Sequence, residues 1–237
     1  MIDRQQPLTA PFPVDEPIVA APAVAKSSNV GIVSGMTDSP RTIILGTGNA
    51  KKAAEVADLL KPHGWLIKTL GEFETRPTIV EDGDSFAGNA AIKAIETARH
   101  YGEFGMGEDS GLVVDALDGA PGIYSARYSG ENATDESNNA KLIEALADVP
   151  EEKRGCGYVC SVAISDTEGN IVLAVEGTCR GRIGFEPCGA NGFGYDPYFV
   201  VREYHRTFGE LGNVVKRKLS HRARAFSKLI PMLGQIP

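Results

Sequence analysis

After position 41, the apolar residues alternate between short runs typical of strands and longer periods typical of helices. Thr42–Leu45 is a short β-branched apolar run, which favours a buried strand. In the next segment an apolar residue recurs at helical spacing, at Ala53, Val56, Leu59 and Leu60. Pro62 and Gly64 then end the helix that this stripe predicts.

The same alternation continues through the middle of the chain. Trp65–Leu70 and Leu112–Ala116 have the composition of strands. A second helix follows Asp84 or Ser85, either of which can act as its N-cap, and its apolar positions are Ala90, Ala91, Ile92, Ala94, Ile95 and Ala98. Asp135–Ala147 is predicted as a third helix, with inward positions at Leu142, Ile143 and Leu146.

The last third of the chain is rich in strand signals. Tyr158–Ser165 and Ile171–Thr178 flank the polar segment Asp166–Asn170, which predicts a hairpin. A C-terminal helix presents Ala223, Phe226, Ile230 and Leu233 on one side, and Pro231 marks its last turn or a kink. Strand–helix units followed by hairpins predict an α/β fold with a mixed sheet.

The first forty residues lack any sustained period and contain six prolines, Pro7, Pro11, Pro13, Pro17, Pro22 and Pro40. Asp15 and Glu16 precede the apolar run 18–25, whereas a secretory signal needs a basic start and a longer apolar core. We therefore interpret residues 1–40 as a disordered tail and residues 41–237 as one domain.

Charge and cysteine content exclude several classes of protein. The net charge of the 237 residues is −7, which argues against general binding to a nucleic-acid backbone. No apolar run approaches the roughly 20 residues of a membrane helix. The four cysteines form no CxxC pair and no zinc spacing with histidine, so we expect reduced, mostly buried thiols in a cytoplasmic protein.

A glycine-containing turn between the first strand and the first helix carries the strongest local signal, Thr47-Gly48-Asn49-Ala50-Lys51-Lys52. Free N–H groups at a helix start attract anions, and a bound phosphate would offset the unfavourable position of two lysines there. The alternative is a pair of solvated surface lysines. The segment matches neither the Walker pattern nor the dinucleotide fingerprint, since Lys51 replaces the third glycine.

Acidic residues form a second group of candidates. Glu81, Asp82 and Asp84 precede the second helix, and Glu108 and Asp109 precede Ser110-Gly111. Magnesium prefers one or two carboxylates together with water and phosphate oxygens. Asp109, predicted at a strand end, is therefore a candidate metal ligand or base. The alternative is a solvated acidic cluster.

Asn89 and Lys93 are four residues apart, so they share one face of the second predicted helix. That face also carries Glu96, and a surface salt bridge from Lys93 to Glu96 is the competing interpretation.

Two later segments have chemistry suited to a purine. In Gly192–Pro197, Phe193 stands between glycines and can offer its ring to a flat base; the alternative is a core ring in a tight bend. Lys216 and the run Ser220-His221-Arg222 offer hydrogen-bond donors. Donors from Arg222 would favour 6-keto purines over adenine, and the alternative is a solvated basic helix end.

Together these segments resemble the inosine triphosphatase / XTP-dITP pyrophosphatase family, from about Arg41 to Leu233. The resemblance is carried by six ordered blocks: Thr47-Gly48-Asn49-x-x-Lys52-x-x-Glu55, Phe86-x-x-Asn89-Ala90-x-x-Lys93-Ala94, Asp109-Ser110-Gly111-Leu112, residues 119–128 (GAPGIYSARY), residues 192–197 (GFGYDP) and Ser220-His221-Arg222. Gly88, Glu108, Val214 and Val215 depart from the family's usual residues.

The resemblance implies an elongated mixed β-sheet with flanking helices, forming two lobes around a central nucleotide cleft, in a homodimer. It implies Mg²⁺-dependent hydrolysis of ITP, dITP and XTP to the monophosphate and pyrophosphate. Asp109 would be the general base and would bind metal with Glu81. The substrate-binding residues would be Thr47, Gly48, Asn49, Ala50, Lys51, Lys52, Lys93, Ser110, Phe193, Gly194, Tyr195, Asp196, Lys216, His221 and Arg222.

Two other classes of function, a nucleotide sensor and an oxidoreductase, compete with this expectation. A nucleotide sensor without turnover would keep Phe193 and Arg222 but would not need Asp109 or the lysines. A nucleotide-dependent oxidoreductase is suggested by Gly46-x-Gly48 alone, and the missing third glycine and ribose-binding acid argue against it.

Overall fold

A computed structural model describes residues 42–63 and 65–236 of the chain. The predicted N-terminal tail, residues 1–40, lies outside the described residues. A single sheet of seven strands runs through the described part, in the order β2-β1-β3-β4-β5-β6-β7. Within this part, no helix has the length and apolar character needed to cross a membrane.

The sheet is mixed, as the sequence predicts. β1 lies parallel to both β2 and β3, and every later pairing is antiparallel. The strands are β1 Thr42–Leu45, β2 Leu66–Thr69, β3 Gly105–Val114, β4 Gly155–Ser165, β5 Ile171–Ile183, β6 Phe199–Val201 and β7 Arg206–Thr207. The α-helices are α1 Ala50–Leu60, α2 Phe86–Tyr101, α3 Asp135–Ala145, α4 Asn213–Leu219 and α5 His221–Leu229.

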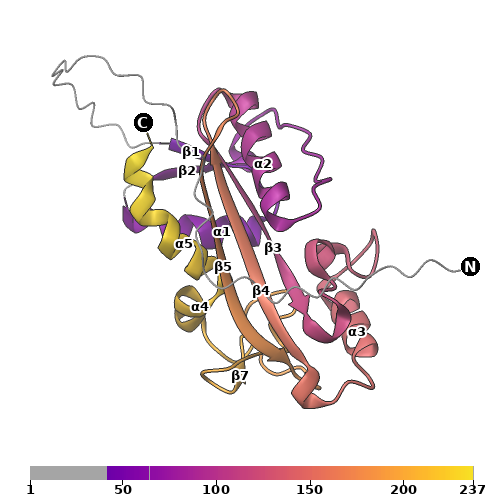
Figure 1. Cartoon of the computed structure of the whole chain (residues 1–237). Helices are drawn as coiled ribbons and strands as arrows, with labels where there is room; N and C mark the ends of the chain where they lie inside the picture. Colours follow the sequence, from indigo (N-terminus) through magenta and orange to yellow (C-terminus); the bar gives the residue numbers. More distant parts are fainter. Residues whose placement is uncertain (1–41, 64, 237) are drawn as a thin grey trace, which may run out of the picture.

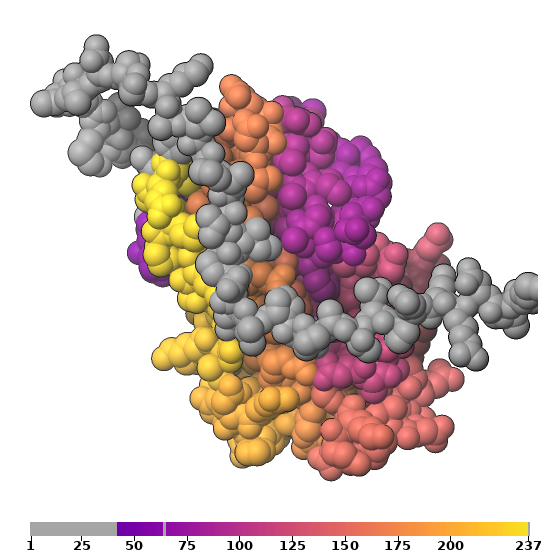
Figure 2. All heavy atoms as spheres, in the orientation of Figure 1, coloured from indigo at the N-terminus to yellow at the C-terminus, as the bar shows by residue number. Residues whose placement is uncertain are grey.

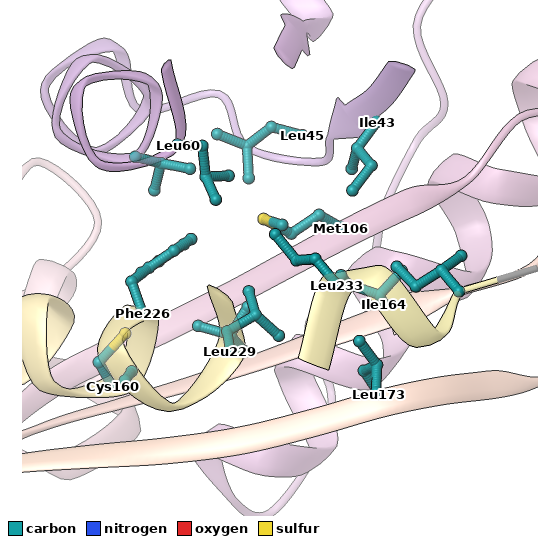
Figure 3. Close-up of a cluster of buried hydrophobic side chains, with 14 of the residues drawn as sticks. Ile43, Leu45, Leu60, Met106, Cys160, Ile164, Leu173, Phe226, Leu229 and Leu233 are labelled. Carbon is teal, nitrogen blue, oxygen red and sulfur yellow. The ribbon is translucent and has the colours of Figure 1, made fainter. Parts of the chain in front are cut away.

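One hydrophobic core lies where α1 and α5 cover the sheet. Figure 3 shows Leu60 of α1 and Phe226 and Leu229 of α5 packed over Met106 of β3 and Ile164 of β4. All five side chains are fully buried. The apolar stripes predicted for the first and last helices are therefore the faces that fold onto this core.

A second core lies farther along the same strands. Cys156 and Tyr158 of β4 belong to it, whereas Cys160 and Ile164 belong to the first core. These positions alternate along β4, so both cores lie on one face of the sheet. The second core also takes side chains from α3 and from the segment 195–211.

The two cores correspond to the two lobes that the resemblance implies. In Figures 1 and 2 the first lobe contains α1, α2 and α5, and the second contains α3, α4 and β7, with the long β4–β5 hairpin running through both. Between the cores on the same face lie charged groups, among them Glu108 of β3. The α/β fold with a mixed sheet is confirmed.

The edge of β3 that faces β1 is mostly unpaired. β1 contacts β3 only at Ile44↔Gly105 and Leu45↔Met106. Beyond Met106 the chain of β1 turns away into the glycine-containing loop, and β3 keeps β4 on its other edge throughout. Farther along, the segment 120–125 covers this edge at Leu112–Val114, so only the middle of β3, Gly107–Gly111, has no strand partner there.

Several element bounds differ from the sequence-based expectations. The predicted strand 112–116 is the end of a ten-residue strand that begins at Gly105. The C-terminal helix ends at Leu229, and a 3₁₀ segment, Ile230–Gln235, continues it around Pro231. This agrees with the expected effect of proline, which cannot donate a helical hydrogen bond. Ser85 rather than Asp84 caps α2, because its side chain accepts from the Gly88 N–H. The helix α4 was not predicted.

Helix α2 approaches the start of β3 at backbone distance. A Cβ atom at Gly105 would lie 2.2 Å from the Ala94 carbonyl oxygen and 2.6 Å from the Ala98 nitrogen. Backbone atoms inside a helix cannot move aside as a flexible side chain can. A side chain at this position would therefore force the helix away from the sheet.

We predict that Gly105→Ala lowers the free energy of unfolding by about 1–3 kcal/mol. For a domain of this size each kcal/mol corresponds to about 2–4 °C in Tm, measured by thermal denaturation. Gly234→Ala is the matched control, because its Cβ meets no atom within 4 Å. Equal Tm values for the two variants would contradict the close packing of α2 on β3.

Candidate active site

The loop between β1 and α1 is held by its own side chains. The Asn49 side chain caps α1 by accepting from the Lys52 N–H at 3.1 Å, and the Thr47 hydroxyl accepts from the Asn49 N–H at 3.2 Å. These bonds satisfy donors that a helix start leaves free. No acidic residue lies in the first turn of α1, so the positive charges of Lys51 and Lys52 are not neutralised within that turn.

Lys52 and Arg222 meet the same buried carboxylate. The Glu108 side chain lies 3.6 Å from Lys52 Nζ and 3.1 Å from Arg222 Nη2. Arg222 is 1% exposed and also donates to the Ser110 hydroxyl at 3.2 Å and to Glu55. Burial this deep is tolerated only because each charge has opposite partners.

The protonation states follow from these contacts. Burial alone would raise the pKa of Glu108, but Arg222 and Lys52 hold that pKa well below its usual range. Burial would lower the pKa of Arg222, and Glu108 together with Cys160 and Glu55 raises it. Both groups are therefore charged at neutral pH.

Lys216 extends the charged group to the aromatic loop. Its ammonium nitrogen lies 3.1 Å from Glu55 and 2.7 Å from Asp196. It also lies 4.3 Å from the centre of the Phe193 ring, within the range of a cation–π contact. Asp196 is buried, which raises its pKa despite the neighbouring Lys216.

On the opposite face of β3, Lys93 joins two carboxylates. Its ammonium nitrogen donates to Glu81 and to Asp109, each at 2.9 Å. Burial alone would lower the pKa of Lys93, yet Asp109 and Glu81 raise it. The Asn89 amide lies 3.4 Å from the second Asp109 oxygen and accepts from the Gly83 N–H at 2.9 Å, so it ties the Glu81 loop to Asp109.

Glu108 and Asp109 are neighbours in the sequence but face opposite sides of the sheet. Successive side chains of a strand alternate, and Glu108 accordingly contacts Arg222 of α5 while Asp109 contacts Lys93 of α2. Both lie on β3 beyond its last pairing with β1. Adjacent residues of one strand therefore anchor both sets of charges.

The pair Glu81 and Asp109 fits a divalent cation. Two carboxylates converge on one ammonium group, so the cluster keeps one negative charge. No group of three His, Cys, Asp or Glu side chains suited to a metal occurs in the described residues. The protein would thus supply two ligands, and phosphate and water oxygens the rest, which is the pattern that magnesium prefers.

Of two cavities in the described part of the chain, one is lined by residues of the candidate site. A cavity of about 420 Å³ lies beside Phe193 and Gly194, between α3 and the segment 187–198. A larger one of about 610 Å³, lined by Glu151, Arg182 and His205 among others, includes none of the charged groups described above. The chemistry on β3 therefore locates the candidate site better than cavity size does.

Comparison with known proteins assigns this architecture to a family. The profile of the Ham1 family matches residues 43–232, which include all the site residues above. The chain belongs to the Ham1 family.

Curated relatives and solved structures are similar over most of the chain. A dITP/XTP pyrophosphatase of Rhodopirellula baltica is 52% identical over 191 residues, which are 81% of this chain and 92% of the relative. One of Desulforamulus reducens is 45% identical, over 82% and 96%. A HAM1 protein structure from Coxiella burnetii has a TM-score of 0.76 at 36% identity, covering 83% of this chain and all of that one.

The Ham1 fold brings most predicted site residues into one region. Lys52, Ser110, Lys216 and Arg222 share one network, and Lys93, Glu81 and Asp109 form the second cluster across β3. Lys51 is exposed and lies 3.4 Å from Asp135 rather than in either group. The ring of Tyr195 is in the second core and its hydroxyl donates to the Ser125 carbonyl, so its side chain serves packing.

Two sequence-based interpretations are corrected by the structure. Asp109 is not at a strand end but in the middle of β3. The glycines Gly105, Gly107 and Gly111 interrupt the alternation of apolar residues that would have indicated a strand. The competing interpretation of Lys93 as a surface partner of Glu96 is wrong, because Lys93 is 5% exposed and its ammonium group bonds to Glu81 and Asp109.

Some side chains at the site were given no role from the sequence. Glu55 pairs with both Lys216 and Arg222, and its place four residues after Lys51 on α1 is the signal that could have suggested it. Asp135 and Asn139 of α3 contact the Gly194 backbone. Their role depends on long-range packing, and nothing local in the sequence reveals it.

His221 is buried in its neutral form. It stacks on Tyr158 at 4.7 Å between ring centres, and its Nδ1 has no hydrogen-bond partner. Burial and the positive charge of Arg222 lower its pKa well below the usual value. Above pH ~6.5 the imidazole is neutral in both folded and unfolded chains, and below that pH only the unfolded chain takes up the proton.

We therefore predict that the free energy of unfolding falls as pH drops from about 7.5 to 5.5, with His221 contributing a slope of up to ~1.4 kcal/mol per pH unit below pH ~6.5. His221→Phe preserves stacking on Tyr158 and should flatten this dependence, as measured by urea denaturation at each pH. Parallel pH profiles for the wild type and the variant would show that His221 is not held neutral.

Proposed function

We propose that this protein hydrolyses the triphosphates of non-standard purine nucleosides, such as ITP, dITP and XTP, to the monophosphate and pyrophosphate. Its Ham1 membership and the names of its relatives support this reaction. The structural observation that carries it is a set of four cations: Lys52 and Arg222 pair with Glu108 of β3, Lys93 pairs with Asp109 of β3, and Lys216 is joined to Arg222 through Glu55.

The cations suit a triphosphate because positioning and charge supply most of the catalysis in phosphoryl transfer. Lys52, at the start of α1, and Lys93, on α2, lie on the two faces of β3. The loop Thr47–Ala50 adds N–H groups at the start of α1. We assign the triphosphate to these groups, entering at the edge that β1 leaves free.

Asp109 is the candidate general base. Its carboxylate is fixed by Lys93 on one oxygen and by Asn89 near the other, so it is held in one orientation. In the proposed reaction Asp109 takes a proton from water as the water oxygen bonds to the α-phosphorus. The bond from that phosphorus to the bridging oxygen breaks, and pyrophosphate leaves.

A divalent metal, which we propose is Mg²⁺, would be held by Glu81 and Asp109 and would neutralise charge on the phosphate oxygens when bound. Lys93 contacts both carboxylates, so it orients them before any substrate arrives.

We assign the base to Phe193 and the donors beside it. The centre of the half-buried Phe193 ring lies 5.4 Å from Lys51 Nζ and 4.3 Å from Lys216 Nζ. Stacking on an aromatic ring contributes about 1–3 kcal/mol per base in single-stranded nucleic-acid complexes. Arg222, which shares Glu55 with Lys216, and the buried His221 are the donors that would favour a 6-keto purine. Ser110 and Asp196 hold Arg222 and the Phe193 backbone in place.

We further propose that residues 41–237 form the pyrophosphatase domain, that two copies make a homodimer, and that the enzyme acts in the cytoplasm. The family match over residues 43–232 supports the domain. The four cysteines in the described part are free, which is typical of a reducing compartment.

We predict that the purified protein with Mg²⁺ converts ITP to IMP and pyrophosphate at least about 100-fold faster than it hydrolyses ATP, a ratio typical of a site that binds a keto group by buried donors. Products are resolved by anion-exchange chromatography, with EDTA as the metal-free control. IDP and orthophosphate as products would mean that the wrong bond is assigned.

We predict that Asp109→Asn lowers kcat by roughly 100- to 10,000-fold, the usual contribution of a general base. Asn is the same size, its oxygen can still accept from Lys93, and Glu81 still pairs with Lys93, so the variant should fold. Its amide nitrogen would face the Asn89 amide donor, so Tm should fall modestly. Asp115→Asn is the control, because it removes a carboxylate that directly follows the same strand and pairs with Arg180 rather than with a residue of the site. Near-normal kcat in Asp109→Asn would remove Asp109 from the mechanism.

A further inference from the structure

Helix α3 holds both backbone polar groups of Gly194, the residue after Phe193. The Gly194 N–H donates to Asp135 Oδ2 at 2.9 Å, and the Gly194 carbonyl accepts from Asn139 Nδ2 at 2.9 Å. Gly194 has a φ of +61°, a conformation that glycine adopts without strain. The turn that carries Phe193 is thus bound at a single residue by two side chains from another part of the chain.

The two side chains are arranged to act together. Asp135 and Asn139 are one helical turn apart, so they lie on the same face of α3. Asn139 Nδ2 also donates to the Asp135 carbonyl at 2.8 Å, which fixes the amide orientation. Asn139 is 8% exposed, so water competes little for its bonds.

Capping of α3 does not require either residue. Thr134 accepts from the Ser137 N–H at 3.1 Å, and Ser137 accepts from the Thr134 N–H at 2.9 Å, which forms a complete capping box. Asn138 binds a different segment through the Ser129 N–H. The contacts of Asp135 and Asn139 with Gly194 are therefore additional to what the helix needs for its own stability.

These contacts restrict where the Phe193 ring can lie. Asp196 accepts from the Phe193 N–H at 2.9 Å, so the residue is held on one side by Asp196 and on the other through Gly194. Asp135 also lies 3.4 Å from Lys51 Nζ, and Lys51 lies 5.4 Å from the centre of the Phe193 ring. Asp135 thus links the phosphate-binding loop to the aromatic ring.

We propose that Asp135 and Asn139 are positioning residues that set the affinity of the enzyme for the purine base by clamping Gly194. This inference rests on the proposed function. The clamp acts on base binding, because both side chains bind the Gly194 backbone. Asn139 has no contact with the lysines assigned to the triphosphate among the bonds described, whereas Asp135 also pairs with Lys51.

The test compares Asp135→Ala, Asp135→Asn and Asn139→Ala with the wild type. Asp135→Ala removes the acceptor for the Gly194 N–H and should raise KM for ITP about 10-fold, which corresponds to ~1.4 kcal/mol, with kcat within about 2-fold. Asn139→Ala should do the same. Asp135→Asn keeps an oxygen acceptor and should restore KM to within about 3-fold of the wild type.

Two measurements separate the clamp from a general loss of structure. Competitive inhibition by inorganic tripolyphosphate, which has no base, should stay within about 2-fold in Asn139→Ala, which keeps the Asp135–Lys51 pair, and should not weaken in the Asp135 variants, which free Lys51. Glu136→Ala is the matched control, since Glu136 is also in the first turn of α3, is exposed, and makes no contact with Gly194 among the bonds described. It should leave KM unchanged.

Hydrogen exchange at the Gly194 amide gives a readout that does not depend on activity. Loss of the Asp135 acceptor should accelerate it at least about 10-fold in Asp135→Ala but not in Glu136→Ala. If the wild type failed to hydrolyse ITP, the substrate assignment would fall while unequal exchange would still support the clamp. Unchanged exchange, or equal weakening of ITP and tripolyphosphate, overturns the clamp.

Discussion

The ion pair between Arg222 and Glu108 is the interaction on which the site depends. Both side chains are almost completely buried, at the level where the first core gives way to the second. A buried charge without a partner costs several kcal/mol, so neither could be there alone. Lys52 and Glu55 complete the group by pairing with the remaining charges. Two apolar lobes can therefore share one sheet while a polar region persists between them.

Strand β3 carries one carboxylate of each charged cluster, and its middle part has no strand partner on one edge. Alternation places Glu108 toward α5 and Asp109 toward α2, so consecutive residues serve two clusters on opposite faces. Pairing with β4 along the whole strand keeps both carboxylates rigid. The short contact with β1 leaves room at the edge. A longer β1 would fill that edge with ladder hydrogen bonds and separate the clusters completely.

The sequence predicted features whose causes are local. Helical stripes and the hairpin loop 166–170 depend on neighbours within a few residues, and the structure has them. The position of Asp109 within a strand was missed because Gly105, Gly107 and Gly111 remove the apolar alternation; they are glycine because α2 and the segment 122–125 approach β3 at backbone distance. The partners of Lys93 and Gly194 come from distant segments, which no local pattern reveals.

The pairing of the cations at the candidate site with carboxylates reconciles stability with binding of a polyanion. Lys52, Lys216 and Arg222 would repel one another if left alone in a region of low dielectric. Glu55, Glu108 and Asp196 neutralise them in the free protein. A triphosphate then competes with these carboxylates for the cations. It can bind only if its contacts with the cations are at least as favourable as the contacts that the carboxylates already make. A polyanion with a matching shape meets that condition, whereas a single phosphate brings too few oxygens. The same carboxylates that stabilise the fold therefore determine how many favourable contacts an anion must make with the cations in order to bind.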